Sequence, residues 1–389
     1  MNQLYMKIYL DILEDIRSGT LNIGDKIPSE NELVKKYNVS RITTRRALDM
    51  LAQRNIIERY RGRGSYVANI TPDKIMASVN DTEMQINFGV ETDVVGLIIP
   101  GFGDDYGSKT LESIEKRCSD HHLCLMLKQT YGKDGEEEKA INMLVNHGIR
   151  GLIFCPTPGK HYNNALLKLV VENFPLVLVD RYLTGIPSSS VCINNKKAAI
   201  TLTNYLLELG HEHIAFVSPS PEGTSSLEDR LMGFHIAMSE KGVRIKPESI
   251  VKNLKGSLQY ASHLKPRRLN IDEYERKKLR KLIDQNPEVT AFIATEYLVA
   301  VLLYEELTSL GKRVPQDYSI VCFDSPMNAV EEPFFTHILQ NEEQMGHEAV
   351  DLLVSHLQEV DPHPAHLEVG YSLVKGKSTQ RNKHASALN

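Results

Sequence analysis

The fold of the N-terminal part can be predicted from residues 27–68, IPSENELVKKYNVSRITTRRALDMLAQRNIIERYRGRGSYVA. Ser29, followed three residues later by Glu32, has the pattern of a capping box and predicts that a helix begins there. A second N-cap residue, Ser40, predicts another helix over about 41–54. Only a short turn separates the two helices, as in a helix-turn-helix.

Two further patterns complete this N-terminal module. Residues 3–18 place leucine and isoleucine side chains on one helical face, and Gly19 predicts the end of that helix. After the third helix, two short apolar runs flank the turn RGRG at 61–64 and predict a hairpin. Three helices, a tight turn and a hairpin together predict a winged helix-turn-helix, which is an architecture for binding DNA.

The helical period divides the third helix into two faces. At about 100° per residue, Thr44, Ala47, Leu48 and Leu51 share one apolar face, which must pack on the other helices. We expect Thr44 to turn its methyl group inward and to bond its hydroxyl to a backbone carbonyl. The outward face carries Ile42, Arg45, Arg46 and Asp49, with Arg41 and Thr43 at its flanks.

Charge is unevenly distributed along the chain. The whole sequence has a net charge of −5, but residues 1–70 carry twelve Lys and Arg against eight Asp and Glu. Seven arginines lie between Arg41 and Arg63. A basic module on an acidic body predicts a polyanion partner for the module alone. The alternative is a solvated basic face of no function.

Composition is that of an ordinary soluble chain. The 389 residues are 41% apolar and 24% charged, which suits two or three domains. No stretch approaches the roughly 20 uncharged apolar residues of a membrane span, and the acidic N-terminal helix is not a signal peptide. The five cysteines are scattered without a CxxC pair. We therefore expect a cytoplasmic protein with reduced thiols and no membrane contact.

The remainder of the chain alternates between apolar strands and helices. Continuous apolar runs predict parallel sheets that are covered on both faces. The expected strands are 94–100, 123–128, 151–156, 175–180, 213–218, 291–295 and 319–324. The expected helices include 108–120, 135–147, 195–209, 227–241 and 297–310. Seven strands exceed one doubly wound domain, so we expect two α/β lobes with a cleft between them.

These patterns set the expected domain boundaries. We expect the winged helix-turn-helix domain over 1–69, a polar linker over 70–93 and the two-lobed body over 94–389. The first lobe is expected to comprise about 94–218 and 325–345, and the second lobe about 219–324 and 346–389.

Two family resemblances rest on specific motifs. Residues 27–68 resemble the DNA-binding domain of the GntR family, through PSENEL, VSRITTRRAL and the glycine-containing wing. The body resembles the effector domain of the LacI family, a periplasmic-binding-protein type I fold with Rossmann-like lobes. Its matching segments are VDRYLTG, LLELGHEHIAFV, DRLMGFHIAM, SLGKRVPQDYSIVCFDSP and THILQNEEQMGHEAV. The combination resembles the arabinose repressor subfamily, which implies a repressor of carbohydrate utilisation genes.

The GntR resemblance implies a set of DNA contacts in the third helix. These residues are Ser40, Arg41, Thr43 and Arg45. The two arginines can reach guanine edges or phosphates, and Ser40 can offer a phosphate its hydroxyl or amide. Arg46 faces either a phosphate or solvent. Asn31 stands where many family members have arginine, so a base contact from the second helix is in doubt.

The hairpin turn is the second expected DNA contact. Arg61, Gly62 and Arg63 form the tip of the wing, and the glycine permits a close approach to the backbone or the minor groove. The partner is a double-stranded DNA operator, and the binding form is a homodimer.

The LacI resemblance implies a ligand cleft between the lobes, lined at the carboxyl ends of strands. A sugar needs bidentate donors, carboxylates that accept from hydroxyl pairs, and an aromatic face. The expected residues are Phe102, Tyr106, Asp180, Arg181, Arg230, Glu296 and Gln340. Glu296 stands where aspartate is typical, and Asn194-Asn195 replaces the usual Asp-Asn.

Other interpretations stay open for individual residues. Asp180 and Arg181 could form a purely structural salt bridge, and Phe102 could belong to the core. His211 and His213 resemble a metal pair, but two ligands do not make a site. We expect no metal and no cofactor.

The resulting hypothesis is a dimeric repressor that a small sugar releases from its operator. The sugar would close the lobes and reorient the DNA-binding heads through the linker. The chain is then not an enzyme. One alternative is a GntR head on a pyridoxal-phosphate enzyme body, and another is a regulator that binds a purine or sugar phosphate. The basic segment 265–281 offers candidates for a phosphate, although it reads more easily as a solvated helix.

Overall fold

The computed structural model describes residues 3–37, 39, 41–53, 56–60, 63–69, 93–103, 106–133, 135–159, 163–255, 273–326, 332–358 and 363–383. The chain forms two compact units, Met1–Thr92 and Asp93–Asn389. The linker expected at 70–93 lies outside the described residues except for its last one.

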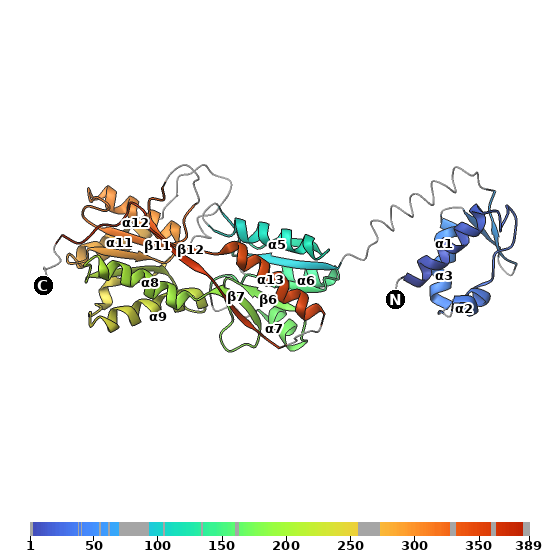
Figure 1. Ribbon diagram of the computed structural model, residues 1–389, viewed down its shortest axis with the longest axis horizontal. Coiled ribbons are helices and arrows are strands. Elements are labelled where there is room, and N and C mark those ends of the chain that lie inside the picture. Colours follow the sequence, from blue (N-terminus) through green and yellow to red (C-terminus); the bar gives the residue numbers. More distant parts are fainter. Residues whose placement is uncertain are drawn as a thin grey trace. The chain divides into compact units, whose positions relative to one another are not determined.

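The first unit contains the expected three helices and hairpin (Figure 1). They are α1 (Gln3–Arg17), α2 (Glu30–Tyr37), α3 (Arg41–Gln53), β1 (Ile57–Tyr60) and β2 (Gly64–Val67). The two strands pair antiparallel, with Ile57 opposite Val67. The predicted bounds are confirmed to within a few residues because caps, a period of 3.6 and turn glycines all act locally.

Side-chain contacts in this unit confirm two local predictions. The Ser29 amide donates to Glu32 Oε2 at 2.7 Å, and the Glu32 amide donates to Ser29 Oγ at 3.4 Å, so the capping box forms. The Ser29 amide also lowers the pKa of Glu32. Thr44 is fully buried and its hydroxyl donates to the Arg41 carbonyl at 3.0 Å. Ala47, Leu48 and Leu51 are buried with it.

The second unit contains two six-stranded sheets (Figure 1). The first sheet has the order β13-β7-β6-β5-β3-β4, and all its pairs are parallel. Its strands are β3 (Val94–Ile99), β4 (Cys124–Gln129), β5 (Gly151–Phe154), β6 (Leu176–Val179), β7 (Ser189–Ile193) and β13 (His366–Val369). Buried apolar runs in β5 and β6 place these strands in the middle of the sheet.

The second sheet has the order β14-β12-β11-β10-β8-β9. Only β14 runs antiparallel to its neighbour β12. Its strands are β8 (Ile214–Pro219), β9 (Ile250–Leu254), β10 (Ala291–Ala294), β11 (Ser319–Phe323), β12 (Thr336–Gln340) and β14 (Tyr371–Val374). We call the first sheet with its helices lobe 1, and the second sheet with its helices lobe 2.

Helices cover both faces of each sheet. In lobe 1 they are α5 (Ser108–Asp120), α6 (Glu136–Asn146), α7 (Asn164–Val171) and α13 (Glu342–Leu357). In lobe 2 they are α8 (Asn195–Glu208), α9 (Ser225–Glu240), α11 (Glu273–Gln285) and α12 (Tyr297–Ser309), with the short 3-10 helix η1 (Pro247–Ser249) before β9. Gly233 lets helices α8 and α9 approach closely, since a Cβ atom at this position would lie only 2.3 Å from the Lys196 carbonyl oxygen. The predicted two-lobed parallel architecture is therefore confirmed.

The lobe boundaries predicted from the sequence are wrong at three places. Helix α8 and strand β8 were expected in lobe 1, but α8 packs on α9 and β8 pairs with β10 in lobe 2. Strand β12 was also expected in lobe 1 but pairs with β11 and β14 in lobe 2. Helix α13 and strand β13 were expected mainly in lobe 2, but α13 packs on α5 and β13 pairs with β7 in lobe 1.

The chain therefore crosses between the lobes three times. The crossings lie between β7 and α8, between β12 and α13, and between β13 and β14. Figure 1 shows the second crossing, where the chain leaves β12 and enters α13. Within the described residues, no helix is both long enough and apolar enough to span a bilayer.

Candidate functional site

The N-terminal unit presents basic side chains on the exposed side of α3. Arg41 and Arg45 are exposed, Thr43 is half-buried, and Arg63 is exposed at the hairpin turn. Ser40, Arg61, Gly62 and the side chain of Arg46 lie outside the described residues. Because the opposite face of α3 is buried, Arg41 and Arg45 share the accessible surface of this helix.

Arg59 differs from these arginines because acidic side chains neutralise it. Its Nη2 lies 2.7 Å from Glu30 Oε1, and its Nη1 contacts Asp49 Oδ1. These bonds join α2, α3 and β1, so Arg59 has a structural role. Arg41, Arg45 and Arg63 form no ion pair with any of the described residues, which leaves their charges available to a polyanion.

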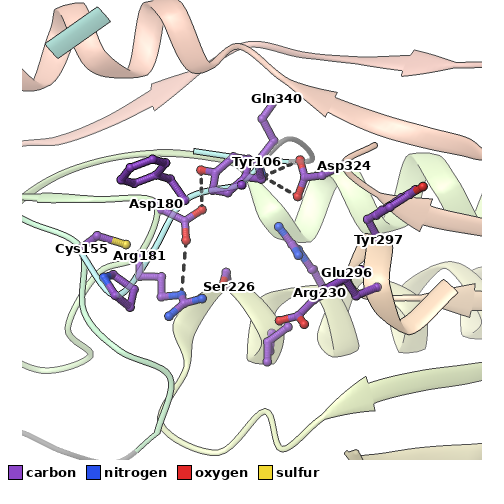
Figure 2. A pocket seen from close by; sticks show the side chains of 16 residues that line it. Tyr106, Cys155, Asp180, Arg181, Ser226, Arg230, Glu296, Tyr297, Asp324 and Gln340 are labelled. Carbon is purple, nitrogen blue, oxygen red and sulfur yellow. Dashed lines mark hydrogen bonds and ion pairs between the residues drawn. The ribbon is translucent and has the colours of Figure 1, made fainter. Parts of the chain in front are cut away.

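A cavity of about 130 Å³ lies between the two lobes of the body, at the carboxyl ends of their strands (Figure 2). All seven residues that we expected at a ligand site line it: Phe102, Tyr106, Asp180, Arg181, Arg230, Glu296 and Gln340. They come from segments that lie up to 238 positions apart in the sequence, because parallel strands end at the same edge of a sheet.

In lobe 1, Asp180 organises its side of the cavity. It directly follows β6 and is 7% exposed. The Tyr106 hydroxyl donates to Asp180 Oδ1 at 2.8 Å, and Arg181 Nε lies 3.3 Å from Asp180 Oδ2 (Figure 2). Arg181 also donates through Nη1 to the Pro156 carbonyl at 2.7 Å. The salt bridge between Asp180 and Arg181, which the sequence left open as an alternative to ligand binding, is present, and both partners line the cavity.

In lobe 2, Asp324 occupies the matching position after β11. Gln340 Nε2 donates to both of its carboxylate oxygens, at 3.0 and 3.2 Å (Figure 2). Asp180 and Asp324 share an unusual backbone conformation, with φ of 70° and 61°. Aspartate tolerates this left-handed region better than most residues, and such conformations concentrate at functional sites. Each lobe therefore presents one carboxylate to the cavity from a strand end.

Arg230 is held rigidly beneath the cavity. It is 4% exposed, and its Nε donates to Asn195 Oδ1 at 2.8 Å. Its Nη1 donates to the Thr295 carbonyl at 2.6 Å, and the guanidinium stacks 3.8 Å from the centre of the Phe323 ring. These hydrogen bonds use Nε and Nη1 of Arg230, so its Nη2 can donate to a ligand.

Burial raises the pKa of three side chains that line the cavity. Burial raises the pKa of Asp324 to about 8; Arg230 and Gln340 oppose that change, and Asp180 and Glu342 add to it. Burial also raises the pKa of Cys155 to about 12, so this lining thiol stays protonated and is a poor nucleophile. Burial and the nearby Asp180 raise the pKa of Tyr106 well above its ordinary value, which keeps its hydroxyl a donor.

Several lining residues were not predicted from the sequence. They are Asp324, Ser226, Cys155, Tyr297 and Leu298, with the loop residues Pro100, Gly101 and Gly103 and the helix residue Leu227. Asp324 could have been found, because it follows an apolar strand in the same way as Asp180. The others carry no pattern that distinguishes them from core or loop residues.

His211, one of the two histidines whose spacing resembles a metal pair, has a structural role. Both ring nitrogens of His211 are engaged, by Thr290 Oγ1 at 2.9 Å and by the Gln380 carbonyl at 3.0 Å. This histidine therefore fastens the start of β8 to neighbouring segments. The cavity offers instead carboxylates, guanidinium groups, an amide and aromatic rings, which is the set of groups that binds a polyhydroxylated molecule.

Both units match known protein families. Residues 4–67 match the bacterial regulatory proteins of the gntR family, and residues 203–379 match a periplasmic binding protein-like domain. The arabinose metabolism transcriptional repressor of Halalkalibacterium halodurans is 26% identical, over 92% of this chain and 90% of that protein. The repressor of the same description from Geobacillus stearothermophilus is 25% identical, over 91% of each chain.

Solved structures share the fold of the body. The crystal structure of the transcription regulator CcpA of Lactococcus lactis superposes with a TM-score of 0.63 at 21% sequence identity. The superposition covers 75% of this chain and the whole of that one.

Proposed function

Because this chain joins a GntR-type helix-turn-helix domain to a periplasmic-binding-protein-like body, we propose that it is a transcriptional repressor controlled by a small sugar. The N-terminal unit binds operator DNA, and the body binds the sugar. The observation that carries the proposal is that the chain combines exposed arginines on α3 with a cavity that has a carboxylate from each lobe. It acts in the cytoplasm as a homodimer on a palindromic operator.

The arabinose repressors that this chain resembles support an effector that contains arabinose or a related sugar unit. The charges in the cavity also favour a neutral sugar over a sugar phosphate. Asp324 holds a proton below its pKa of about 8, so the carboxylates of Asp180 and Glu296 balance the two guanidinium groups of Arg181 and Arg230. Arg181 already pairs with Asp180, so a phosphate would gain little from it.

The geometry suggests how sugar binding changes the DNA affinity. A ligand that contacts Asp180 in lobe 1 and Asp324 in lobe 2 favours the arrangement in which both lobes touch it. A differential affinity of about 1–3 kcal/mol between the two states is enough for a 5- to 150-fold change in operator binding. A match to a binding-protein fold favours this regulatory role over catalysis by a pyridoxal-phosphate body.

The test uses electrophoretic mobility shift with operator DNA selected from random-sequence pools, with and without sugars. The wild-type protein is expected to bind one sequence class tightly and to release it on addition of a sugar. Arg230→Ala is expected to retain DNA binding and to need at least tenfold more sugar for release, with thermal unfolding as the check that the body still folds. If Arg230→Ala responded to the same sugar concentration as wild type, the cavity would not be the effector site.

A further inference from the structure

A second chamber lies beside the ligand cavity and shares Arg181 with it. This outer chamber has a volume of about 370 Å³ and also lies between the lobes. Lobe 1 contributes the loops after β5 and β6, and lobe 2 contributes the start of α9. Its lining residues in lobe 1 are Pro156, Thr157, Gly159, Arg181, Tyr182, Leu183 and Thr184. Nothing in the family matches or in the relatives' names assigns a role to this chamber.

Buried polar atoms without a hydrogen-bond partner connect the two chambers. Among the described residues, four buried side-chain atoms have no such partner. Gln340 Oε1 belongs to the inner cavity, Arg181 Nε to the wall that both chambers share, and Thr157 Oγ1 to the outer chamber. The fourth is Asn286 Oδ1, outside both. Buried polar atoms are normally bonded, so an unsatisfied atom in each chamber, Gln340 Oε1 and Thr157 Oγ1, indicates that a polar ligand reaches both.

The size of the inner cavity limits what it can hold. At 10–15 Å³ for each water-sized position, its 130 Å³ offers about ten positions, comparable to the non-hydrogen atoms of one pentose. A longer carbohydrate would therefore have to continue past Arg181 into the outer chamber. Figure 2 shows Arg181 at this edge of the cavity, beside Cys155.

The charged groups of the outer chamber favour a neutral occupant. Glu228 Oε1 accepts from the Gly223 amide at 2.8 Å, so part of this carboxylate is already used. Arg181 is the one cation among the described lining residues, and it pairs with Asp180. A hydroxyl group can bond to Thr157 Oγ1, whereas an anion meets no uncompensated positive charge because Arg181 Nε already faces Asp180 Oδ2.

We propose that the effector is an elongated neutral carbohydrate of at least two linked sugar units. One unit occupies the inner cavity between Asp180 and Asp324, and the next unit passes Arg181 and bonds to Thr157 in the outer chamber. Both units then bridge the lobes, so both contribute to closure. This inference rests on the proposed sugar-responsive function and specifies the length of the ligand.

The first test measures binding of matched sugar pairs to the full chain by calorimetry, with DNA release as a second readout. The pairs are arabinose with arabinobiose, xylose with xylobiose, glucose with cellobiose, and galactose with lactose. For the pair that binds, the disaccharide is expected to bind at least tenfold more tightly than its monosaccharide. A monosaccharide that binds as tightly as its disaccharide overturns the inference but leaves the proposed function intact. If no sugar binds or releases DNA, the proposed function fails, and the inference fails with it.

The second test locates the second sugar unit with Thr157→Val. This change keeps the shape of the side chain and removes a hydroxyl that has no partner, so the fold is expected to be unaffected. Monosaccharide affinity is expected to stay the same, and disaccharide affinity to fall about 3- to 10-fold. Thr308→Val, at the opposite end of α12 from the cavity residue Tyr297, is the matched control. Equal disaccharide affinity in Thr157→Val and wild type would show that the second sugar unit does not bind in this chamber.

Discussion

Thr44 and Arg45 are neighbours in the sequence and have opposite environments. Thr44 is buried and donates to the Arg41 carbonyl, whereas Arg45 is exposed. The helical step of about 100° explains this division, and the burial of Ala47 and Leu48 fixes its direction. The arginines of this segment therefore differ in their environments. Arg45 is exposed, whereas Arg59 pairs with Glu30 and Asp49.

Arg45→Ala is expected to weaken operator binding about tenfold or more and to reduce the preference for operator over random DNA. A bidentate arginine contact to a base edge accounts for about 1–3 kcal/mol of discrimination. Mobility shift with specific and random duplexes measures both quantities. Arg150→Ala, which removes an exposed arginine of the body, is the control. Unchanged selectivity in Arg45→Ala would show that Arg45 does not contact base edges.

Asp324 should make the stability of the body depend on pH. Its folded pKa of about 8 is above its ordinary value of 3.8, so the folded state holds a proton that the unfolded state has lost. Between about pH 4 and pH 8, raising the pH therefore lowers the free energy of unfolding, by up to about 1.4 kcal/mol for each pH unit.

Asp324→Asn is expected to remove this contribution, so that the variant loses less stability than wild type between pH 6 and pH 8. Urea unfolding at both pH values measures the difference. Asp284→Asn replaces an exposed aspartate of the same lobe and should behave as wild type. Parallel losses in all three proteins would show that Asp324 is ionised in the folded state at pH 6.

Helix α9 combines two functions along one element. Ser226, Leu227 and Arg230 line the cavity, whereas Ser225 and Asp229 hold lobe 1. The Tyr182 amide donates to Ser225 Oγ at 2.9 Å, and the Tyr182 hydroxyl donates to Asp229 Oδ2 at 3.0 Å. Tyr182 directly follows the cavity residues Asp180 and Arg181. The same two segments thus join the lobes and line the cavity.

Tyr182→Phe is expected to lower the stability of the body by about 1 kcal/mol, because Asp229 loses a donor. The concentration of sugar for half-release of DNA should rise about 2- to 10-fold, since the closed arrangement loses one bond. Thermal unfolding and a sugar titration by mobility shift measure the two effects. Tyr131→Phe, at a tyrosine that is 56% exposed, is the control. Loss of stability with an unchanged titration would make Tyr182 purely structural.

Across the body as a whole, the three crossings between lobes are tied to one another. Asn194 caps α8 by accepting from the Lys197 amide at 2.9 Å, and its Nδ2 donates to Glu368 Oε1 at 2.8 Å. The Asn341 amide donates to the Gly370 carbonyl at 3.1 Å. The first crossing thus contacts the end of β13, and the second contacts Gly370 in the third crossing. Asparagine at 194, in place of the aspartate that the family resemblance leads one to expect, supplies the donor that Glu368 requires.

Asn194→Asp is expected to keep the helix cap but to set two carboxylates against each other. The body should then lose up to about 1 kcal/mol of stability at neutral pH and low salt, since Glu368 is exposed and the repulsion is screened. The loss should disappear below about pH 4, where both groups bind protons. Adding Glu368→Gln should restore thermal stability. If it did not, the contact between Asn194 and Glu368 would have no energetic role.

Features that depend on neighbouring residues could be predicted from the sequence. Caps, helical period and turn glycines predicted α1, α2, α3 and the hairpin, and uninterrupted apolar runs predicted the central strands of both sheets. All seven predicted ligand residues line one cavity because strand ends can be recognised in the sequence and parallel strands end together. Strands β7, β9, β12, β13 and β14 were not predicted, since polar residues interrupt their apolar runs.

Only the tertiary structure decided which lobe each segment joins. Ser190 pairs with His366 across β7 and β13, and no local pattern specifies a partner so distant in the sequence. The same long-range pairing sets Asp324 opposite Asp180 and creates the outer chamber beside Arg181. Burial then raises the pKa of Asp324, which its residue type alone does not reveal. These properties belong to contacts between distant segments, because burial and strand pairing arise only when the whole chain packs together.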